Sequence, residues 1–167
     1  NNDLLFEFGK ELKFYKWIPE IFEKTKEIVK QNSTFQEYNI KVEHYIVSTG
    51  MKRMIEGSII KKHVEDIWGC EIIQSLDENE KFEISEIGYT IDNTSKTRAI
   101  FEINKGVNKN TKYDVNAKIK EGNRRVLFKN MIYIADGPSD VPAFSVIKKG
   151  GVSTFAIYPK SDLKAFQ

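Results

Sequence analysis

One short stretch constrains the fold of this chain most strongly, the run Met131-Ile-Tyr-Ile-Ala-Asp-Gly-Pro-Ser-Asp140. An apolar segment ends there in an acidic turn, and a new amphipathic segment begins at Val141. In open α/β proteins a parallel strand ends in this way, and ligands bind at the carboxyl ends of such strands. The stretch therefore predicts an α/β fold with a binding edge at Asp136 and Asp140.

The acidic turn has two interpretations. Its carboxylates are hard oxygen ligands beside a flexible Gly137 and a stiff Pro138, and this setting suits Mg²⁺. The alternative is a solvated turn in which Ser139 or Asp140 caps the following helix. The local pattern leaves both open, because short motifs carry a risk of false positives.

The composition is that of an ordinary globular protein, and it excludes several functional classes. The 167 residues suffice for one domain with a substantial core, and 26 basic against 24 acidic side chains leave a net charge of +2. This near balance gives no general attraction to nucleic acid or to a membrane surface, so neither is expected as a partner.

No apolar run approaches the roughly 20 residues that span a bilayer. Cys70 is the single cysteine, which favours a reducing compartment such as the cytoplasm.

The amino terminus, Asn1-Asn-Asp-Leu-Leu, lacks the basic and apolar regions of a signal peptide. It also lacks an initiator Met, which favours a chain that is processed, truncated or recorded in part.

Strand-like and helix-like segments alternate along the chain. Helical spacing predicts helices over 19–31, 51–56, 59–67, 95–104 and 141–149, and β-rich segments predict strands over 40–47, 70–74, 82–89, 131–135 and 152–158. Gly106 and Gly150 stop the two later helices, and 107–125 reads mostly as loop. The alternation predicts an α/β sandwich with a largely parallel sheet.

Two further sites could join the acidic pair at one sheet edge. Ser48-Thr49-Gly50 is expected as a turn at a strand end, where hydroxyls and turn N–H groups bind phosphate oxygens, although such residues also simply cap helices. Lys96 begins a helix, an unusual place for a cation given the helix dipole. It is either solvated or positioned for an anionic ligand. Together the three sites supply a metal site, a cation and a hydroxyl donor, the groups that neutralise charge in the transition state of phosphoryl transfer.

Three segments resemble, in order, motifs two, three and four of the haloacid dehalogenase (HAD) superfamily: Ser48-Thr-Gly, Lys96-Thr-Arg-Ala-Ile-Phe-Glu-Ile and Ile134-Ala-Asp-Gly-Pro-Ser-Asp140. The polar hairpin before Lys96 is most similar to phosphoserine-phosphatase-type members, and the resemblance covers about 41–158. Ala135 stands where many relatives have Gly.

The resemblance implies a Rossmann-like three-layer sandwich with a mainly parallel sheet and a small β-hairpin excursion. It implies a single core domain over 1–167 that is incomplete at both ends, with 1–15 as a remnant of a cap or linker.

The resemblance also implies roles for these residues. Ser48, with Thr49 and Gly50, would bind the transferring phosphoryl group, and Lys96 would neutralise that group and the nucleophile. Asp136 would ligate Mg²⁺, and Asp140 would support the metal site or its waters.

One departure from the family is serious. The family's nucleophile is an Asp in an Asp-x-Asp motif upstream of the serine motif, and nothing before Ser48 matches it. Asp92-Asn-Thr94 follows an apolar run but lies after the serine motif, so it is interpreted as a decoy. The nucleophile is therefore expected upstream of this chain. The missing strand would be supplied by an unrecorded amino-terminal segment, a second chain or a rearranged strand near Leu4 to Phe8.

The sequence thus predicts a Mg²⁺-dependent phosphoryl hydrolase that acts on a small phosphorylated substrate through an aspartyl-phosphate. The alternative is a non-catalytic HAD-like fragment or pseudoenzyme that serves as a binding or interaction module. The remaining candidates have structural interpretations. His44 is expected as a satisfied structural histidine, His63 as a surface residue and Cys70 as a small buried residue, and no zinc motif is present.

Overall fold

The computed structural model describes residues 1–110 and 112–158, which divide into two compact units. The first unit is Asn1–Thr90, and the second begins at Ile91. Among the described residues, no helix combines the length and the apolar character needed to cross a membrane.

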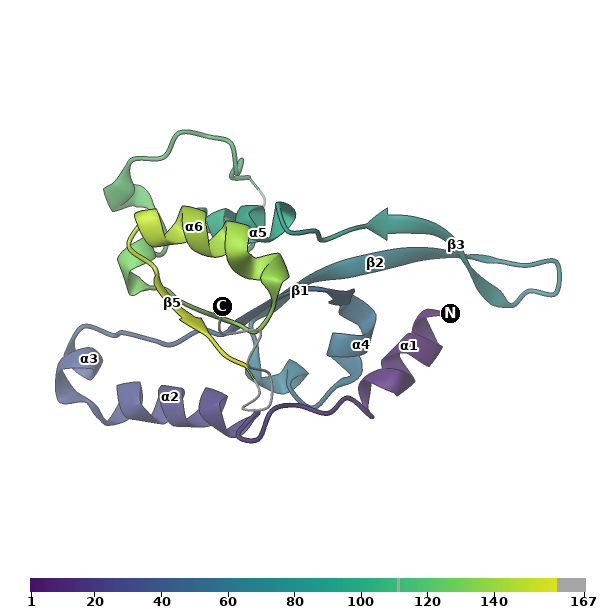
Figure 1. Ribbon diagram of the computed structural model, residues 1–167, viewed down its shortest axis with the longest axis horizontal. Helices are drawn as coiled ribbons and strands as arrows, with labels where there is room; N and C mark the ends of the chain where they lie inside the picture. The colour runs from purple at the N-terminus through teal and green to yellow at the C-terminus, as the bar shows by residue number, and fades with distance from the viewer. Residues whose placement is uncertain (111, 159–167) are drawn as a thin grey trace. The chain divides into compact units, whose positions relative to one another are not determined.

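The first unit combines short helices with a three-stranded sheet (Figure 1). Its sheet has the order β1-β2-β3, in which β1 pairs parallel with β2 and β2 pairs antiparallel with β3. The elements are α1 (Asn2–Gly9), α2 (Glu20–Gln31), α3 (Ser33–Glu37), β1 (Tyr45–Met51), α4 (Lys52–Gly57), the 3-10 turn η1 (Lys61–His63), β2 (Asp66–Leu76) and β3 (Phe82–Tyr89).

The core of this unit lies between α2, α4 and the start of β2. Its buried members are Phe22, Ile55, Ile60, Val64 and Ile67. A second contact joins α1 to α4 through two glycines. A Cβ atom on Gly9 would collide with the Met54 carbonyl oxygen, and one on Gly57 would collide with the Phe6 carbonyl oxygen. The two helix backbones touch because neither glycine carries a side chain.

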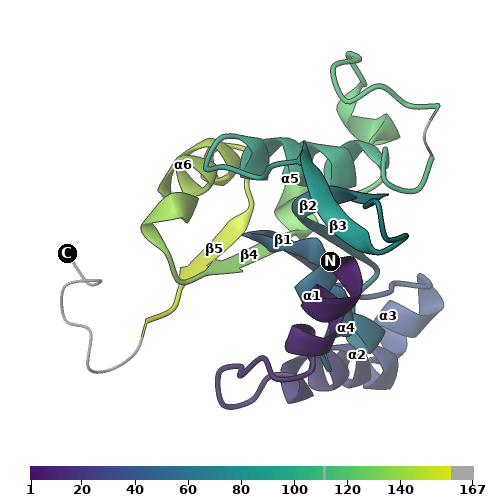
Figure 2. The same ribbon diagram turned by 90° about the vertical axis from the view of Figure 1, so that its right-hand side faces the viewer.

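The second unit is built around a β-α-β arrangement (Figure 2). Strand β4 (Ile132–Ala135) pairs parallel with β5 (Ser153–Ala156), and α6 (Val141–Lys149) connects them. Helix α5 (Ser95–Lys105) packs on α6, and the buried residues between these elements are Ile100, Ala143, Ile147 and Val152. The 3-10 turns are η2 (Glu121–Asn123), η3 (Phe128–Asn130) and η4 (Pro138–Asp140).

The expected Rossmann-like three-layer sandwich with a mainly parallel sheet is wrong. The described strands form a mixed three-stranded sheet and a separate two-stranded parallel sheet. The Rossmann-like form was expected from the family resemblance, and the largely parallel sheet from strand–helix alternation, including a helix over 59–67. In the structure this segment is a short turn, Lys61–His63, and Ile67 already belongs to β2. Short apolar runs do not separate the helical period from the strand period, which explains the error.

Several individual elements were predicted correctly. Strand β3 and helix α6 have the expected bounds, and α2 and α5 differ by one residue at an end. Gly106 ends α5 in a left-handed conformation with φ of 79°, which a residue without Cβ adopts readily.

Two expectations for the first unit are wrong. Ser48-Thr49-Gly50 is not a turn after a strand but lies inside β1, where the register with β2 shifts between Val47 and Met51. Leu4 to Phe8 form part of helix α1, so they supply no rearranged strand.

Candidate functional site

The amino terminus of α5 is organised by Asp92. Its Oδ1 atom accepts hydrogen bonds from the Thr94 N–H at 2.8 Å, from the Ser95 N–H at 2.7 Å and from the Ser95 hydroxyl at 2.9 Å. The bonds to Ser95 and then to Thr94 hold the pKa of the Asp92 carboxyl below its usual range. The Oδ1 atom of Asp92 thus holds the first turn of α5, and the interpretation of Asp92 as a decoy stays a prediction.

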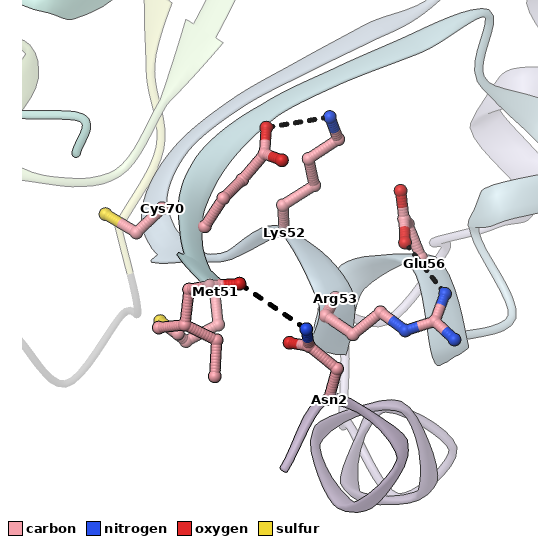
Figure 3. A pocket seen from close by; sticks show the side chains of 8 residues that line it. Asn2, Met51, Lys52, Arg53, Glu56 and Cys70 are labelled. Carbon is pink, nitrogen blue, oxygen red and sulfur yellow. Dashed lines mark hydrogen bonds and ion pairs between the residues drawn. The ribbon is translucent and has the colours of Figure 1, made fainter. Parts of the chain in front are cut away.

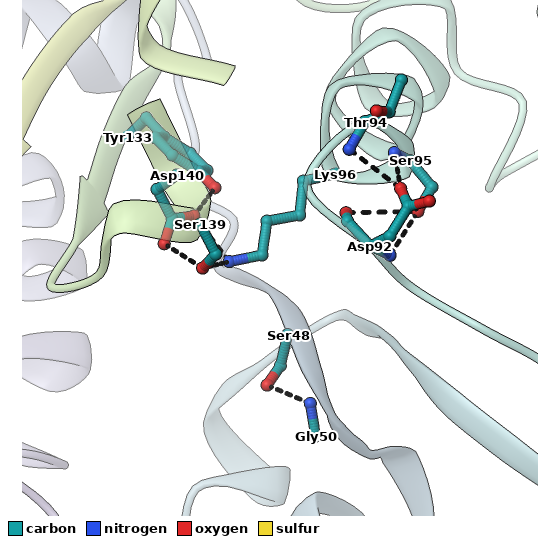
Figure 4. A network of polar contacts seen from close by, with 9 residues as sticks. All are labelled: Ser48, Gly50, Asp92, Thr94, Ser95, Lys96, Tyr133, Ser139 and Asp140. Carbon is teal, nitrogen blue, oxygen red and sulfur yellow. Dashed lines mark hydrogen bonds and ion pairs between the residues drawn. The ribbon is translucent and has the colours of Figure 1, made fainter. Parts of the chain in front are cut away.

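Lys96 follows in the first turn of α5, and it is buried, with 4% of its surface exposed. Its Nζ atom donates to Asp140 Oδ1 at 2.8 Å and to the Ser139 hydroxyl at 2.9 Å (Figure 4). The fully solvated interpretation of Lys96 is therefore wrong. A buried cation requires a paired carboxylate, and Asp140 provides it from a segment 44 residues away.

Asp140 receives a second donor from strand β4. The Tyr133 hydroxyl donates to Asp140 Oδ1 at 2.5 Å. Burial and the bond to Asp140 raise the pKa of the Tyr133 hydroxyl far above its usual range, so this hydroxyl stays protonated and remains a donor. Asp140 stands at the N-cap position of α6, but its side chain makes no capping hydrogen bond there. The carboxylate is directed to Lys96 and Tyr133 instead.

Asp136 is the first residue after β4 and is exposed. The turn that follows it is closed by a hydrogen bond from the Asp140 N–H to the Gly137 carbonyl at 3.0 Å. Asp136 and Asp140 thus belong to one short turn at the carboxyl end of a parallel strand, as the sequence predicts.

The donor set of this turn fits Mg²⁺ only with help from waters or substrate. Among residues 1–110 and 112–158, no three His, Cys, Asp or Glu side chains gather closely enough to hold a metal ion. Mg²⁺ is commonly bound by one or two carboxylates, with waters and substrate phosphate oxygens completing its shell. Asp136 fits the role of a direct ligand. Asp140 fits a supporting role, since its Oδ1 already accepts from Lys96 and Tyr133.

The serine motif lies in the first unit. The Ser48 hydroxyl accepts a hydrogen bond from the Gly50 N–H at 3.0 Å, and the Thr49 carbonyl accepts one from the Cys70 thiol at 3.3 Å. Lys96, Asp136 and Asp140 belong to the second unit. The structure brings Lys96 to Asp140, whereas the convergence of Ser48 with them stays a prediction.

Two partners of Lys96 and Asp140 were missed by the sequence reasoning, Ser139 and Tyr133. The sequence pattern indicates Ser139 as a candidate helix cap and Tyr133 as a strand residue. The sequence feature that could have indicated Tyr133 is its position in strand β4. It stands three residues before Asp136 and points to the α6 side of the sheet, where it packs on the core and meets Phe144 at 5.4 Å between ring centroids.

The two histidines lie in the first unit. The prediction that His63 is a surface residue is wrong, because it is 7% exposed and stacks on Phe22 with ring centroids 5.8 Å apart. His44 Nε2 lies 2.8 Å from the Thr25 hydroxyl oxygen, whereas its buried Nδ1 has no hydrogen-bond partner among the described residues, so the expected satisfied histidine is satisfied at one ring nitrogen only. Burial, followed by the charges of Lys26 and His63, lowers the pKa of His44.

A pocket in the first unit contains none of the predicted site residues (Figure 3). Its charged side chains are paired, Lys52 with Glu71 at 2.9 Å and Arg53 with Glu56 at 3.2 Å. Its volume of about 110 Å³ is below the roughly 300–1,000 Å³ that small-molecule sites enclose. The lining residues are Asn2, Met51, Lys52, Arg53, Glu56, Cys70, Glu71 and Ile72.

Comparison with known proteins finds a curated relative, an uncharacterized protein of Borreliella burgdorferi. The two sequences are 36% identical over 179 residues, a match that covers 99% of this chain. The chain spans 60% of the length of that relative. No family model and no solved structure matches the chain.

Proposed function

We propose that this chain is part of a HAD-like, Mg²⁺-dependent phosphoryl hydrolase that acts on a small phosphorylated substrate. One observation carries the proposal: a buried lysine, Lys96, is bound to Asp140 in the turn at the carboxyl end of β4 that also contains the exposed residue Asp136. The proposal depends on this site and not on the fold class, because the same chemistry occurs on unrelated folds.

The charges at this turn suit the transfer of a phosphoryl group. Two N–H bonds of the Lys96 ammonium are used by Ser139 and Asp140, and an ammonium has three donors. The third would bind a phosphoryl oxygen. Mg²⁺ held by Asp136 would neutralise charge on the phosphoryl oxygens. The Asp140 carboxylate holds Lys96 in place, and Ser48 would donate to the same group if the two units bring it there.

The reaction divides into two displacements. A carboxylate attacks phosphorus, its new P–O bond forms as the bond to the leaving oxygen breaks, and that oxygen takes a proton. Water then attacks the acyl phosphate and releases inorganic phosphate. Within the proposal this nucleophilic carboxylate comes from residues outside these 167, and the enzyme works in the cytoplasm.

The test is a phosphatase assay of the complete protein with p-nitrophenyl phosphate, with and without Mg²⁺. Asp136→Asn should reduce turnover by at least about 100-fold while leaving the circular dichroism spectrum unchanged. The matched control is Asp114→Asn, which changes an exposed carboxylate of the same unit that accepts a local bond from the Asn116 N–H. Full activity of Asp136→Asn, or equal losses in both variants, would contradict the assignment.

A second candidate is a binding module without catalysis. The favouring observation is that the Lys96 ammonium is already paired with Asp140 inside the protein, as in a purely structural ion pair. The gene sequence before Asn1 separates the two candidates. An apolar strand ending in Asp-x-Asp supports the hydrolase, and its absence supports the module.

A further inference from the structure

The β2–β3 hairpin has an exposed outer strand, β3, beside a partly buried β2. All eight residues of β3 are exposed, and Figure 1 shows the tip of the hairpin running past α1 and α4. Among residues 1–110 and 112–158, β3 pairs with β2 and with no second strand. An edge strand can pair with another chain, and its bulges and charged side chains restrict which chains fit.

Two bulges in β3 determine which of its side chains lie on each face of the hairpin. The ladder shifts at Ser85 and at Gly88, each an extra residue of β3 opposite a continuous β2. Ile73 of β2 lies on the face of Glu86, whereas the opposite face carries Phe82, Ile84 and Ile87 of β3 with Ile72 and Leu76 of β2. The exposed ones are Leu76 at 56%, Phe82 at 51%, Ile84 at 55% and Ile87 at 73%.

The other face of β3 is acidic. Glu83 and Glu86 stand opposite Ser75 and Ile73 of β2, with no basic side chain across the ladder. Residues 71–89 contain six acidic side chains and one basic side chain, a net charge of −5. The whole chain has a net charge of +2, so the remaining residues have a net charge of +7. Negative charge is therefore concentrated on this hairpin.

We propose that the open edge of β3 is a docking site for an extended protein segment in which apolar and basic residues alternate. Such a segment would add as a further strand. Its apolar side chains would cover Ile84 and Ile87, and its basic side chains would pair with Glu83 and Glu86 on the other face. Main-chain hydrogen bonds provide affinity in this mode of recognition, and alternate side chains provide specificity.

A second copy of this chain fits the edge less well. Two β3 strands side by side would bring their Glu83 and Glu86 rows onto one sheet, and like charges on neighbouring strands are destabilising. A basic partner removes this repulsion. It also covers a hairpin that is only marginally stable as two strands in water.

The test is hydrogen–deuterium exchange of the complete protein, followed by mass spectrometry of the segment 82–89. The probe is an eight-residue peptide of alternating valine and lysine. Addition of the peptide should slow exchange in β3, because its outward N–H groups become hydrogen-bonded. The control peptides are alternating valine and glutamate, and the valine–lysine peptide with alternate backbone nitrogens methylated, which blocks strand pairing. Neither control should protect β3.

Reversing the charge of the two glutamates tests whether charge complementarity selects the bound segment. Glu83→Lys combined with Glu86→Lys should weaken binding of the valine–lysine peptide by at least about tenfold and create binding of the valine–glutamate peptide. Protection by the methylated peptide equal to that by the unmodified one would overturn strand addition in favour of diffuse charge attraction. Slow exchange of β3 before any peptide is added would also overturn it, since the edge would already be occupied by another part of the protein or by a second copy.

Discussion

Charged side chains are buried and paired at the Lys96 site, whereas they are exposed on the β2–β3 hairpin. Lys96 and Asp140 are each 4% exposed and bound to each other, so their charges are withdrawn from water. Glu83 and Glu86 are exposed on a strand with an open edge. A buried pair is fixed in place and costly to disturb, whereas an exposed row contributes little to stability and remains available to a partner. The energetic cost of changing a charge should therefore differ sharply between the two regions.

The largest effect is expected at Lys96. Lys96→Met leaves the Asp140 carboxylate buried without its cation and should lower the free energy of unfolding by about 3–5 kcal/mol. Urea unfolding measures this change. The double variant Lys96→Met/Asp140→Asn should recover part of the loss, because a neutral amide still accepts from Tyr133. A single variant as stable as the wild type would mean that the pair is not buried in solution.

Removing the second donor to Asp140 should have a smaller effect. Tyr133→Phe deletes the hydroxyl bonded to Asp140 Oδ1 and should cost about 1.5 kcal/mol in urea unfolding, a typical value for a hydrogen bond to a charged group. Tyr113→Phe is the matched control, because Tyr113 is 51% exposed in the same unit. Equal stability of the two variants would contradict the contribution of the Tyr133 hydroxyl.

The sequence predicted features that depend on neighbouring residues and did not predict those that depend on tertiary contacts. The bounds of β3 follow from a β-rich run after a polar turn, and those of α6 from Asp140 before it and Gly150 after it, all of them local signals. The burial of His63 depends on a stack with Phe22, 41 residues away, which no local pattern reports.

The same limit applies to the candidate site. The acidic turn after β4 was visible in the sequence, because a carboxylate directly after an apolar run is a local pattern. The donation by Tyr133 was not visible, since it depends on how the strand turns this side chain toward Asp140. The β2–β3 hairpin was predicted from the polar turn between its strands, but the mainly parallel sheet was wrong. Among the described strands, β4 and β5 pair only with each other and do not join the β1-β2-β3 sheet, a tertiary outcome that no local pattern reports.

A pH effect is expected at His44. Its pKa is lowered in the folded protein, chiefly by burial, so protonation favours the unfolded state. The stabilising contribution is complete above the unfolded pKa of about 6.5 and is lost as the pH falls below that value toward the folded pKa. Unfolding by urea at pH 7 and pH 5 measures this, with His44→Asn as the variant that should lose the His44 share of the difference. An unchanged pH dependence in that variant would contradict the assignment.

The smallest effect is expected on the hairpin, and it bears most directly on the comparison. Ile84→Thr and Ile100→Thr make the same change at a side chain of 55% exposure and at one of 4% exposure. Ile100 packs between α5 and α6, so the substitution there leaves a cavity and a buried hydroxyl and should cost at least about 2 kcal/mol. At Ile84 the change should stay within about 0.5 kcal/mol, because little apolar surface is withdrawn from water in the free protein. Thermal and urea unfolding of both variants give the two values. A loss at Ile84 as large as that at Ile100 would mean that the apolar face is covered in the free protein, and the hairpin would then be part of the protein's own core and not a surface available to a partner.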